Sequence, residues 1–346
     1  MQRLHMTQPS PHWKRRFRAA GRILIWGLLF LLVVWASAAL FFDVRIARLR
    51  YPAIAVYLLA NGAVLVFLRS FLKRAFGVLA CFAVMLCWWL SLRPSDNGPW
   101  QEDVSRTAWA DVIGERITLH NLRQCGYRME SQYTCQWQTR VVDLKDLRGV
   151  DLFLDYWGSP WITHTILSFD FGGGNRIAFS IEARKRVGQR YSAIGAFFRQ
   201  FTLISVIIDE RDVVRLRTNY RTGEDLYLYH TTATIPFARG LFLDYVGLTN
   251  YLHVHPKWYN AVTHNCTTQI FALKSMRSQP WWHWEILLNG KGDAMEYRLG
   301  NLAADKLSFE ELRRRAYINP AARAAGLSDD FSAKIRAGCP GFLHPE

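Results

Sequence analysis

The stretch that decides the fold of the C-terminal part of the chain is WITHTILSFDFGGGNRIAFSIEA, residues 161–183. Apolar and polar residues alternate on both sides of three consecutive glycines, which predicts two strands, 161–171 and 175–183, joined as a hairpin. If the strands pair symmetrically about Gly173, facing residues have numbers that sum to 346. This register places His164 opposite Glu182 and Asp170 opposite Arg176, about 5 Å apart on one face.

Further elements are predicted on both sides of this hairpin. Strands are expected at 116–122, 135–142, 203–209 and 225–231, with 143–151 as a connection. Helices are expected at 233–254, at 263–276 and through much of the tail, where Ser308 precedes two glutamates in the manner of a helix start. The fold class is therefore α+β, an antiparallel sheet with packed helices.

The first 92 residues have a different character. Residues 23–42 are twenty in a row without a charge, and residues 51–68 and 75–92 form runs of eighteen. A membrane-spanning helix needs about 20 apolar residues and tolerates about 17. Three transmembrane helices are predicted at 23–92, preceded by a basic N-terminus at 1–22 and followed by a linker at 93–110 and a domain at 111–346.

Basic residues in the short flanking segments predict the orientation. Nine Lys and Arg lie in the N-terminal segment and in the link between the second and third spans, against three in the link between the first two. The positive-inside rule then puts the N-terminus in the cytoplasm and the C-terminal domain on the other side of the membrane, with the inner membrane as partner. Residues 1–99 hold thirteen Lys and Arg and two Asp, or +11 of the total +15, so the domain lacks the basic surface that a nucleic-acid partner requires.

Two cysteines suggest a disulfide. Cys125 and Cys135 are ten residues apart, and in an oxidising compartment they could close a hairpin; two separate thiols are the alternative. Cys81 and Cys87 lie in the third predicted span, and Cys339 has no evident role.

The candidate nucleophile is Cys266, within the segment YNAVTHNCTTQIF at 259–271. A capping residue at Thr263 or Asn265 would place Cys266 in the first turn of a helix, where the helix dipole favours a thiolate. His164 is the candidate base and Glu182 the group that orients it. A strand histidine, a strand acid and a helix cysteine form the papain constellation in circularly permuted order. A buried inert cysteine and a structural histidine are the alternatives.

The domain resembles the family of the Lnb N-terminal periplasmic domain, named after a lipoprotein N-acyltransferase. The resemblance runs from about residue 100 to about residue 341. It is carried by DLFLDYWGSP at 151–160, HTILSFDF at 164–171, SIEAR at 180–184, FFRQ at 197–200, DERD at 209–212, YN at 259–260 and NCTT at 265–268. It implies a periplasmic Cys–His site that moves a fatty acyl chain onto an amine, with His164 and Cys266 at the matching positions.

Further residues are candidates for supporting or substrate-binding roles. They are Tyr259, Asn260, Asn265, Thr267, Arg184 and Arg199. There are enough potential ligands for a zinc ion in His253, His255, His264 and Cys266. A bound metal would quench the nucleophile, so we predict neither a metal nor a cofactor.

Three functions follow from this pattern. The first is a membrane-tethered, cysteine-dependent acyl-transfer enzyme that acts through a thioester on Cys266, with a phospholipid or lipoprotein as substrate. The second is a cell-wall amidase or peptidase with the same Cys–His site. The third is a non-catalytic binding module of the cell envelope.

Overall fold

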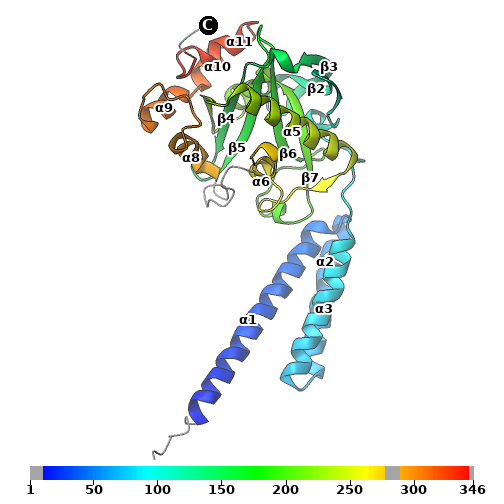
Figure 1. Ribbon diagram of the computed structural model, residues 1–346. Coiled ribbons are helices and arrows are strands. Elements are labelled where there is room, and N and C mark those ends of the chain that lie inside the picture. The colour runs from blue at the N-terminus through cyan, green and yellow to red at the C-terminus, as the bar shows by residue number, and fades with distance from the viewer. Residues whose placement is uncertain (1–10, 277–288, 343–346) are drawn as a thin grey trace, which may run out of the picture. The chain divides into compact units, whose positions relative to one another are not determined.

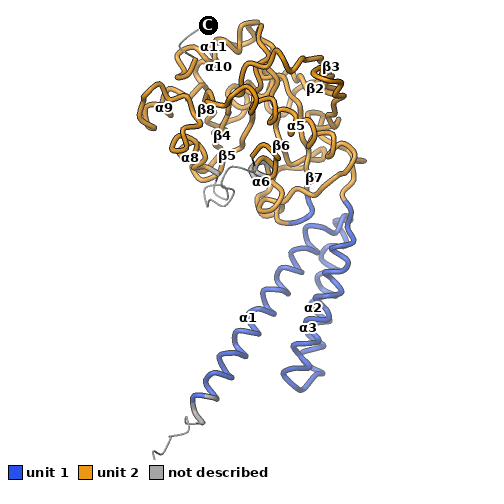
Figure 2. Tube along the Cα trace, viewed as in Figure 1, with its two compact units in different colours: residues 1–93, 198–200 blue, residues 94–197, 201–346 orange. Residues whose placement is uncertain are grey.

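The computed structural model describes residues 11–276 and 289–342, except for the side chains of Pro11, His12, Lys14, Cys266, Thr267 and Phe271. The chain forms two compact units, Met1–Arg93 with Phe198–Gln200, and Pro94–Phe197 with Phe201–Glu346 (Figure 2). Each is described by itself.

The first unit consists of three long apolar helices, α1 (Pro11–Asp43), α2 (Ala47–Phe67) and α3 (Phe71–Ser91). All three are long and apolar enough to cross a membrane. Near the ends of α1 and α3, the Trp89 indole N–H donates to Asp43 Oδ2 at 2.7 Å, which gives this carboxylate a partner. The three predicted spans therefore correspond to three helices.

The second unit is built on one sheet (Figure 1). Its strands are β1 (Trp109–Ile113), β2 (Arg116–Met129), β3 (Gln132–Asp143), β4 (Gly149–Trp157), β5 (Thr163–Asp170), β6 (Arg176–Arg184), β7 (Thr202–Asp209), β8 (Glu224–His230) and β9 (Lys257–Trp258). The order is β1-β2-β7-β6-β5-β4-β8, with β3 beside β2 and β9 beside β7. The sheet is antiparallel except between β2 and β7, which run parallel.

The hairpin of β5 and β6 has the predicted register. Ile166 faces Ser180 and Asp170 faces Arg176, so the numbers of paired residues sum to 346. All three glycines of the turn have positive φ, a conformation that side chains disfavour. A Cβ on Gly172 would also meet the Arg148 side chain at 2.6 Å. The glycines thus fix both the turn and the pairing.

Helices cover the two faces of the sheet. On one face, α5 (Ile235–Val254), α6 (Cys266–Phe271) and α9 (Phe309–Ala316) contribute to a core with Phe169, Phe179 and Ile207. On the other face, α4 (Glu210–Arg215), α10 (Asn319–Ala325) and α11 (Phe331–Arg336) pack on Phe153 and Ile166. A π-helical segment, η4 (Leu216–Tyr220), follows α4. The remaining short elements are the helix α8 (Gly292–Arg298) and the 3-10 turns η1 (Glu102–Val104), η2 (Leu144–Asp146), η3 (Gly195–Phe197), η5 (Lys274–Met276) and η6 (Asn289–Lys291).

Three expectations differ from the structure. The connection predicted at 143–151 already contains the start of β4, a strand buried on both faces. The helix predicted at 263–276 is split into α6 and η5. The linker predicted at 93–110 packs into the second unit, because the Arg184 guanidinium binds Asp96 at 2.8 Å and lies over the Trp100 ring.

Candidate functional site

The His164 imidazole lies at the start of β5, joined to an acid through a hydroxyl. Its Nε2 is 2.7 Å from Ser180 Oγ, which donates to Glu182 Oε1 at 2.7 Å. Nε2 and Glu182 Oε1 are themselves 3.9 Å apart. The single hydroxyl proton of Ser180 is directed at Glu182, so the proton between His164 and Ser180 must come from Nε2. The relay therefore favours the tautomer in which Nδ1 is the basic nitrogen.

Arginines hold the acid of this relay in its charged form. Burial alone would raise the pKa of Glu182, but Arg123 and Arg217 outweigh it and keep that pKa well below its usual range. Arg217 Nη2 is 3.6 Å from Glu182 Oε1. Burial, helped by Arg217, lowers the pKa of His164 to about 3. The structure thus holds His164 neutral beside an ionised Glu182.

A second acid faces His164 from the neighbouring strand. Asp155 is its partner in the β4–β5 pairing, and Arg217 Nε donates to Asp155 Oδ2 at 2.9 Å. The other oxygen, Oδ1, is buried with no hydrogen-bond partner among the described residues. Burial raises the pKa of Asp155 to about 7. A buried carboxyl with a raised pKa therefore lies on the strand next to His164.

The helix that carries the candidate nucleophile begins with a capping box. Asn265 Oδ1 accepts from the Thr268 N–H at 2.9 Å, and the Thr268 hydroxyl accepts from the Asn265 N–H at 2.9 Å. These bonds start α6 at Cys266, as the segment predicts. The side chains of Cys266 and Thr267 lie outside the described residues, so their roles stay predictions.

Helix α6 and the His164 relay approach the sheet from different faces. Ile270 of α6 belongs to the core on the α5 face, whereas Ile166, two residues after His164 on the same side of β5, belongs to the opposite core. His164 is the second residue of β5. The side chain of Cys266 lies outside the described residues, so its contact with His164 stays a prediction.

The segment before α6 is tied to this same end of the sheet. Lys257 and Trp258 pair with the first residues of β7, and the Tyr259 N–H donates to Phe201 O at 3.0 Å. Asn260 Oδ1 accepts from the N–H groups of Val262 and Thr263. Tyr259 and Asn260 thus shape the loop before Cys266.

The two candidate arginines already have partners. Arg184 is buried, and it donates to Val104 O at 2.8 Å and Ser105 O at 2.9 Å in addition to Asp96. Its guanidinium fastens the segment after the spans to β6, and its predicted substrate-binding role stays a prediction. Arg199 belongs to the first unit, where its guanidinium lies 4.0 Å from the centre of the Trp89 ring.

The candidate disulfide partners face one another. Cys125 and Cys135 are directly paired between β2 and β3 and form a disulfide. The neighbouring Cys125 N–H donates to the buried Asp212 carboxylate at 2.7 Å, and Arg123 binds the same group. The disulfide therefore closes a hairpin that is also held by hydrogen bonds to the buried Asp212.

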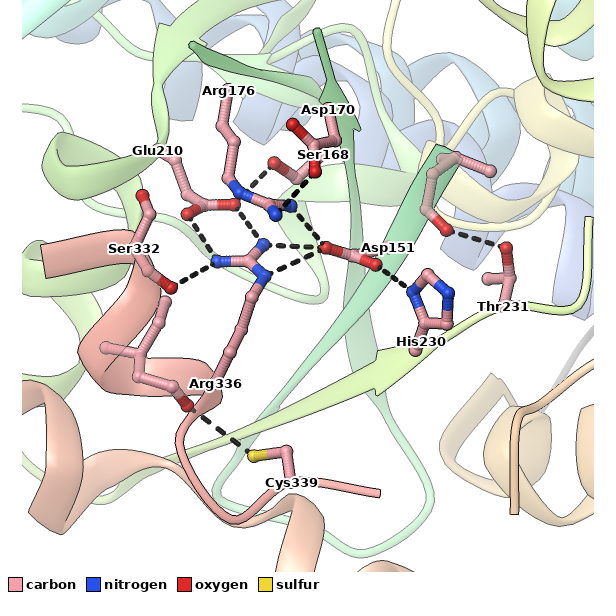
Figure 3. Close-up of polar contacts among 12 residues, drawn as sticks. Asp151, Ser168, Asp170, Arg176, Glu210, His230, Thr231, Ser332, Arg336 and Cys339 are labelled. Carbon is pink, nitrogen blue, oxygen red and sulfur yellow. Dashed lines mark hydrogen bonds and ion pairs between the residues drawn. The ribbon is translucent and has the colours of Figure 1, made fainter. Parts of the chain in front are cut away.

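Figure 3 shows a second buried polar cluster. It lies on the same face of the sheet as the relay, because Ser168 and His164 both alternate in phase with Ile166 on β5. Arg336 donates to Asp151 Oδ2 at 2.7 Å and to Glu210 through two nitrogens, at 2.8 and 2.6 Å. Arg176 also donates to Asp151 at 2.7 Å, and Ser168 donates to Glu210 at 2.5 Å. Both acids have pKa values below their usual range: although burial opposes this, Arg336 outweighs it. This cluster fastens α11 to the sheet.

Ser180, Asp155 and Arg217 were not predicted as site residues from the sequence. Ser180 is two residues before Glu182, so strand alternation alone puts both on one face. Asp155 required the pairing of β4, which was not predicted as a strand. Arg217 comes from η4, and nothing in the hairpin sequence points to it.

A comparison with models of known protein families finds a match within this domain. The family model of the Lnb N-terminal periplasmic domain matches residues 133–288. Over these residues the chain is similar to that family. The match to the Lnb domain includes His164, Ser180, Glu182 and Cys266. It is shorter than the resemblance from 100 to 341, since β1, β2 and the C-terminal helices from α8 onward lie outside it. No curated protein and no solved structure matches the sequence. Three apolar helices together with an Lnb domain describe a membrane protein with a periplasmic domain.

Proposed function

We propose that the chain is a membrane-tethered periplasmic enzyme that transfers acyl groups through a thioester on Cys266. The observation that carries the proposal is the relay of His164, Ser180 and Glu182 within an Lnb domain that also starts α6 at Cys266. The relay favours a neutral imidazole with Nδ1 as its basic nitrogen, which is the form that accepts a thiol proton.

The proposed reaction has two halves. His164 takes the thiol proton of Cys266, and the sulfur attacks the carbonyl carbon of an ester. The resulting oxyanion collapses, the C–O bond breaks, and the departing oxygen takes the proton from His164. An amine then attacks the thioester carbonyl, His164 takes the proton that the amine loses, and the C–S bond breaks. The departing thiolate recovers that proton from His164. Glu182, held ionised by its arginines, stabilises the imidazolium that forms in each half.

The low pKa of His164 belongs to the structure as described. A thiolate placed beside Nδ1 would raise it, because an opposite charge favours the imidazolium. The proposed mechanism requires the sulfur of Cys266 to reach Nδ1 of His164. A membrane-bound donor suits this site, because a tethered enzyme and its lipid share one surface.

The test is acyl transfer by the full chain in proteoliposomes that contain a phospholipid labelled in its acyl chain, with a lipopeptide amine as acceptor. Cys266→Ala should reduce turnover by about 10⁴-fold or more. Cys87→Ala is the matched control, since Cys87 is an exposed thiol of α3. Equal turnover by Cys266→Ala and the unaltered protein would remove Cys266 from the mechanism. New free amines from peptidoglycan fragments, without acyl transfer, would favour the amidase instead.

One observation favours a non-catalytic envelope module. α6 and His164 approach the sheet from opposite faces. A partly buried, neutral histidine that is hydrogen-bonded to Ser180 can be purely structural. The two functions differ in thiol chemistry. A catalytic Cys266 should alkylate well below pH 8, whereas an inert one should react slowly throughout.

A further inference from the structure

Two loops of the second unit meet at the end of the sheet where β6 stops and β7 starts. The first is 185–197, between these strands, and the second is 259–264, before α6. The Ala261 N–H donates to Ala196 O at 2.9 Å, and Asn260 Nδ2 donates to Phe197 O at 3.3 Å. We refer to these two loops together as the loop face.

Large apolar side chains of the loop face are exposed. Val187 is 69% exposed, Ile194 65%, Phe197 48% and Val262 47%. Single exposed apolar residues need no explanation, but four on two adjoining loops form a group. Such a group of exposed apolar side chains is typical of a surface that becomes buried against a partner.

The charge around this group has one sign. There is no Asp or Glu between Glu182 and Asp209, and none from residue 245 to residue 276. The loop face itself carries Lys185, Arg186 and Arg190. Exposed apolar side chains on loops that carry basic and no acidic residues match a bilayer surface rich in anionic lipid. At such a surface Lys and Arg meet phosphate and apolar groups enter the interface.

The length of the chain limits how far this face can lie from a membrane, whatever the arrangement of the two units. α3 ends at Ser91, and Asp96 already binds Arg184, which directly precedes the loop face. An extended chain covers at most about 3.6 Å per residue, so these five residues reach about 18 Å at most. A bilayer that holds α3 is therefore within reach.

We propose that the loop face binds the surface of an anionic phospholipid bilayer. Val187, Ile194, Phe197 and Val262 enter the interfacial layer, and Lys185 and Arg190 contact lipid phosphates. Arg184 takes no part, because its guanidinium is already bound within the domain. The inference does not depend on the proposed enzymatic function, and it holds equally for a binding module.

The experiment is photo-crosslinking of the full chain in proteoliposomes of phosphatidylglycerol and phosphatidylethanolamine. A photoreactive phenylalanine analogue replaces Ile194 or Val262, and Leu327 or Met129 in the controls. Leu327 and Met129 are exposed apolar residues at the other end of the sheet; Leu327 O accepts from Arg211, just beyond the C-terminal end of β7. We expect lipid adducts by mass spectrometry at Ile194 and Val262 but not at the controls.

A second arm tests the charges. Lys185→Gln with Arg190→Gln should lower the adduct yield at Ile194 several-fold, since each basic group near an anionic surface is worth about fivefold. Arg314→Gln with Lys334→Gln, two exposed basic residues on α9 and α11, is the matched control and should leave the yield unchanged. Equal adducts at all four positions, or crosslinks at Ile194 and Val262 only to a second copy of the chain or to another protein, would overturn the proposal.

Discussion

Replacing Arg336 by methionine tests whether the buried cluster of Figure 3 holds the C-terminal helices to the sheet. Arg336 has hydrogen bonds to two buried acids. After its removal Asp151 keeps Arg176. Glu210 keeps only the Ser168 hydroxyl as a side-chain hydrogen-bond partner among the described residues. Removing one partner of a buried ion pair costs about 3–5 kcal/mol. For a domain of this size each kcal/mol lowers the melting temperature by about 2–4 °C, so we expect a fall of about 6–20 °C.

The loss should depend on pH. In the unaltered protein Glu210 has a lowered pKa in the folded state, so its contribution is present above the unfolded pKa and is lost as the pH falls through the folded value. Without Arg336 the buried, charged carboxylate of Glu210 has no arginine bound to it at pH 7. Once Glu210 is protonated, it carries no charge that needs such a partner. The deficit of Arg336→Met should therefore shrink between about pH 7 and pH 4, and adding Glu210→Gln should recover part of it.

The assay is thermal unfolding of the full chain in detergent micelles, followed by brief proteolysis of the second unit at each temperature. Lys334→Met is the matched control on the same helix, because its pair with Asp330 is exposed, and it should leave the midpoint nearly unchanged. A midpoint of Arg336→Met within about 2 °C of the unaltered protein, or a deficit that does not vary with pH, would refute the reasoning.

Three other predictions concern the relay and the disulfide. Ser180→Ala should remove the preference of the His164 proton for Nε2, seen in the nitrogen chemical shifts of that ring; an unchanged tautomer would contradict the relay. The depressed pKa of His164 means that stability rises with pH between about 3 and 6.5, and His164→Gln should flatten that slope in denaturant titrations at a series of pH values, while an unaltered slope would assign it to other groups. Opening the disulfide with Cys125→Ser and Cys135→Ser frees a ten-residue loop, which should cost about 2–3 kcal/mol; equal denaturant midpoints with and without the bridge would argue against this.

Local sequence signals predicted the elements that they control. The hairpin register followed from Gly172, Gly173 and Gly174, because a turn with positive φ at each residue leaves the strands one way to pair. The three apolar helices followed from length alone. Strand β4 was missed because Asp151 and Asp155 interrupt its apolar pattern, and each is buried only because an arginine from elsewhere in the chain binds it.

Less of the candidate site than of the fold could be predicted from the sequence. Pairing arithmetic brought His164 and Glu182 to the same face, but it did not reveal that Ser180 stands between them. Which face α6 covers depends on the packing of Ile270 against residues far away in the chain, and no local pattern encodes that choice. The contact between Cys266 and His164 therefore stays a prediction.

The bridge between Cys125 and Cys135 has a consequence for how the protein is made. A cross-strand disulfide forms only where the surroundings oxidise thiols, and the bacterial cytosol keeps them reduced. A copy whose domain failed to cross the membrane would retain both thiols, and copies that crossed would lose them. The redox state of this cysteine pair therefore reports whether a chain has been exported. It can be measured on newly synthesised chains by mass-tagging of unreacted sulfhydryls.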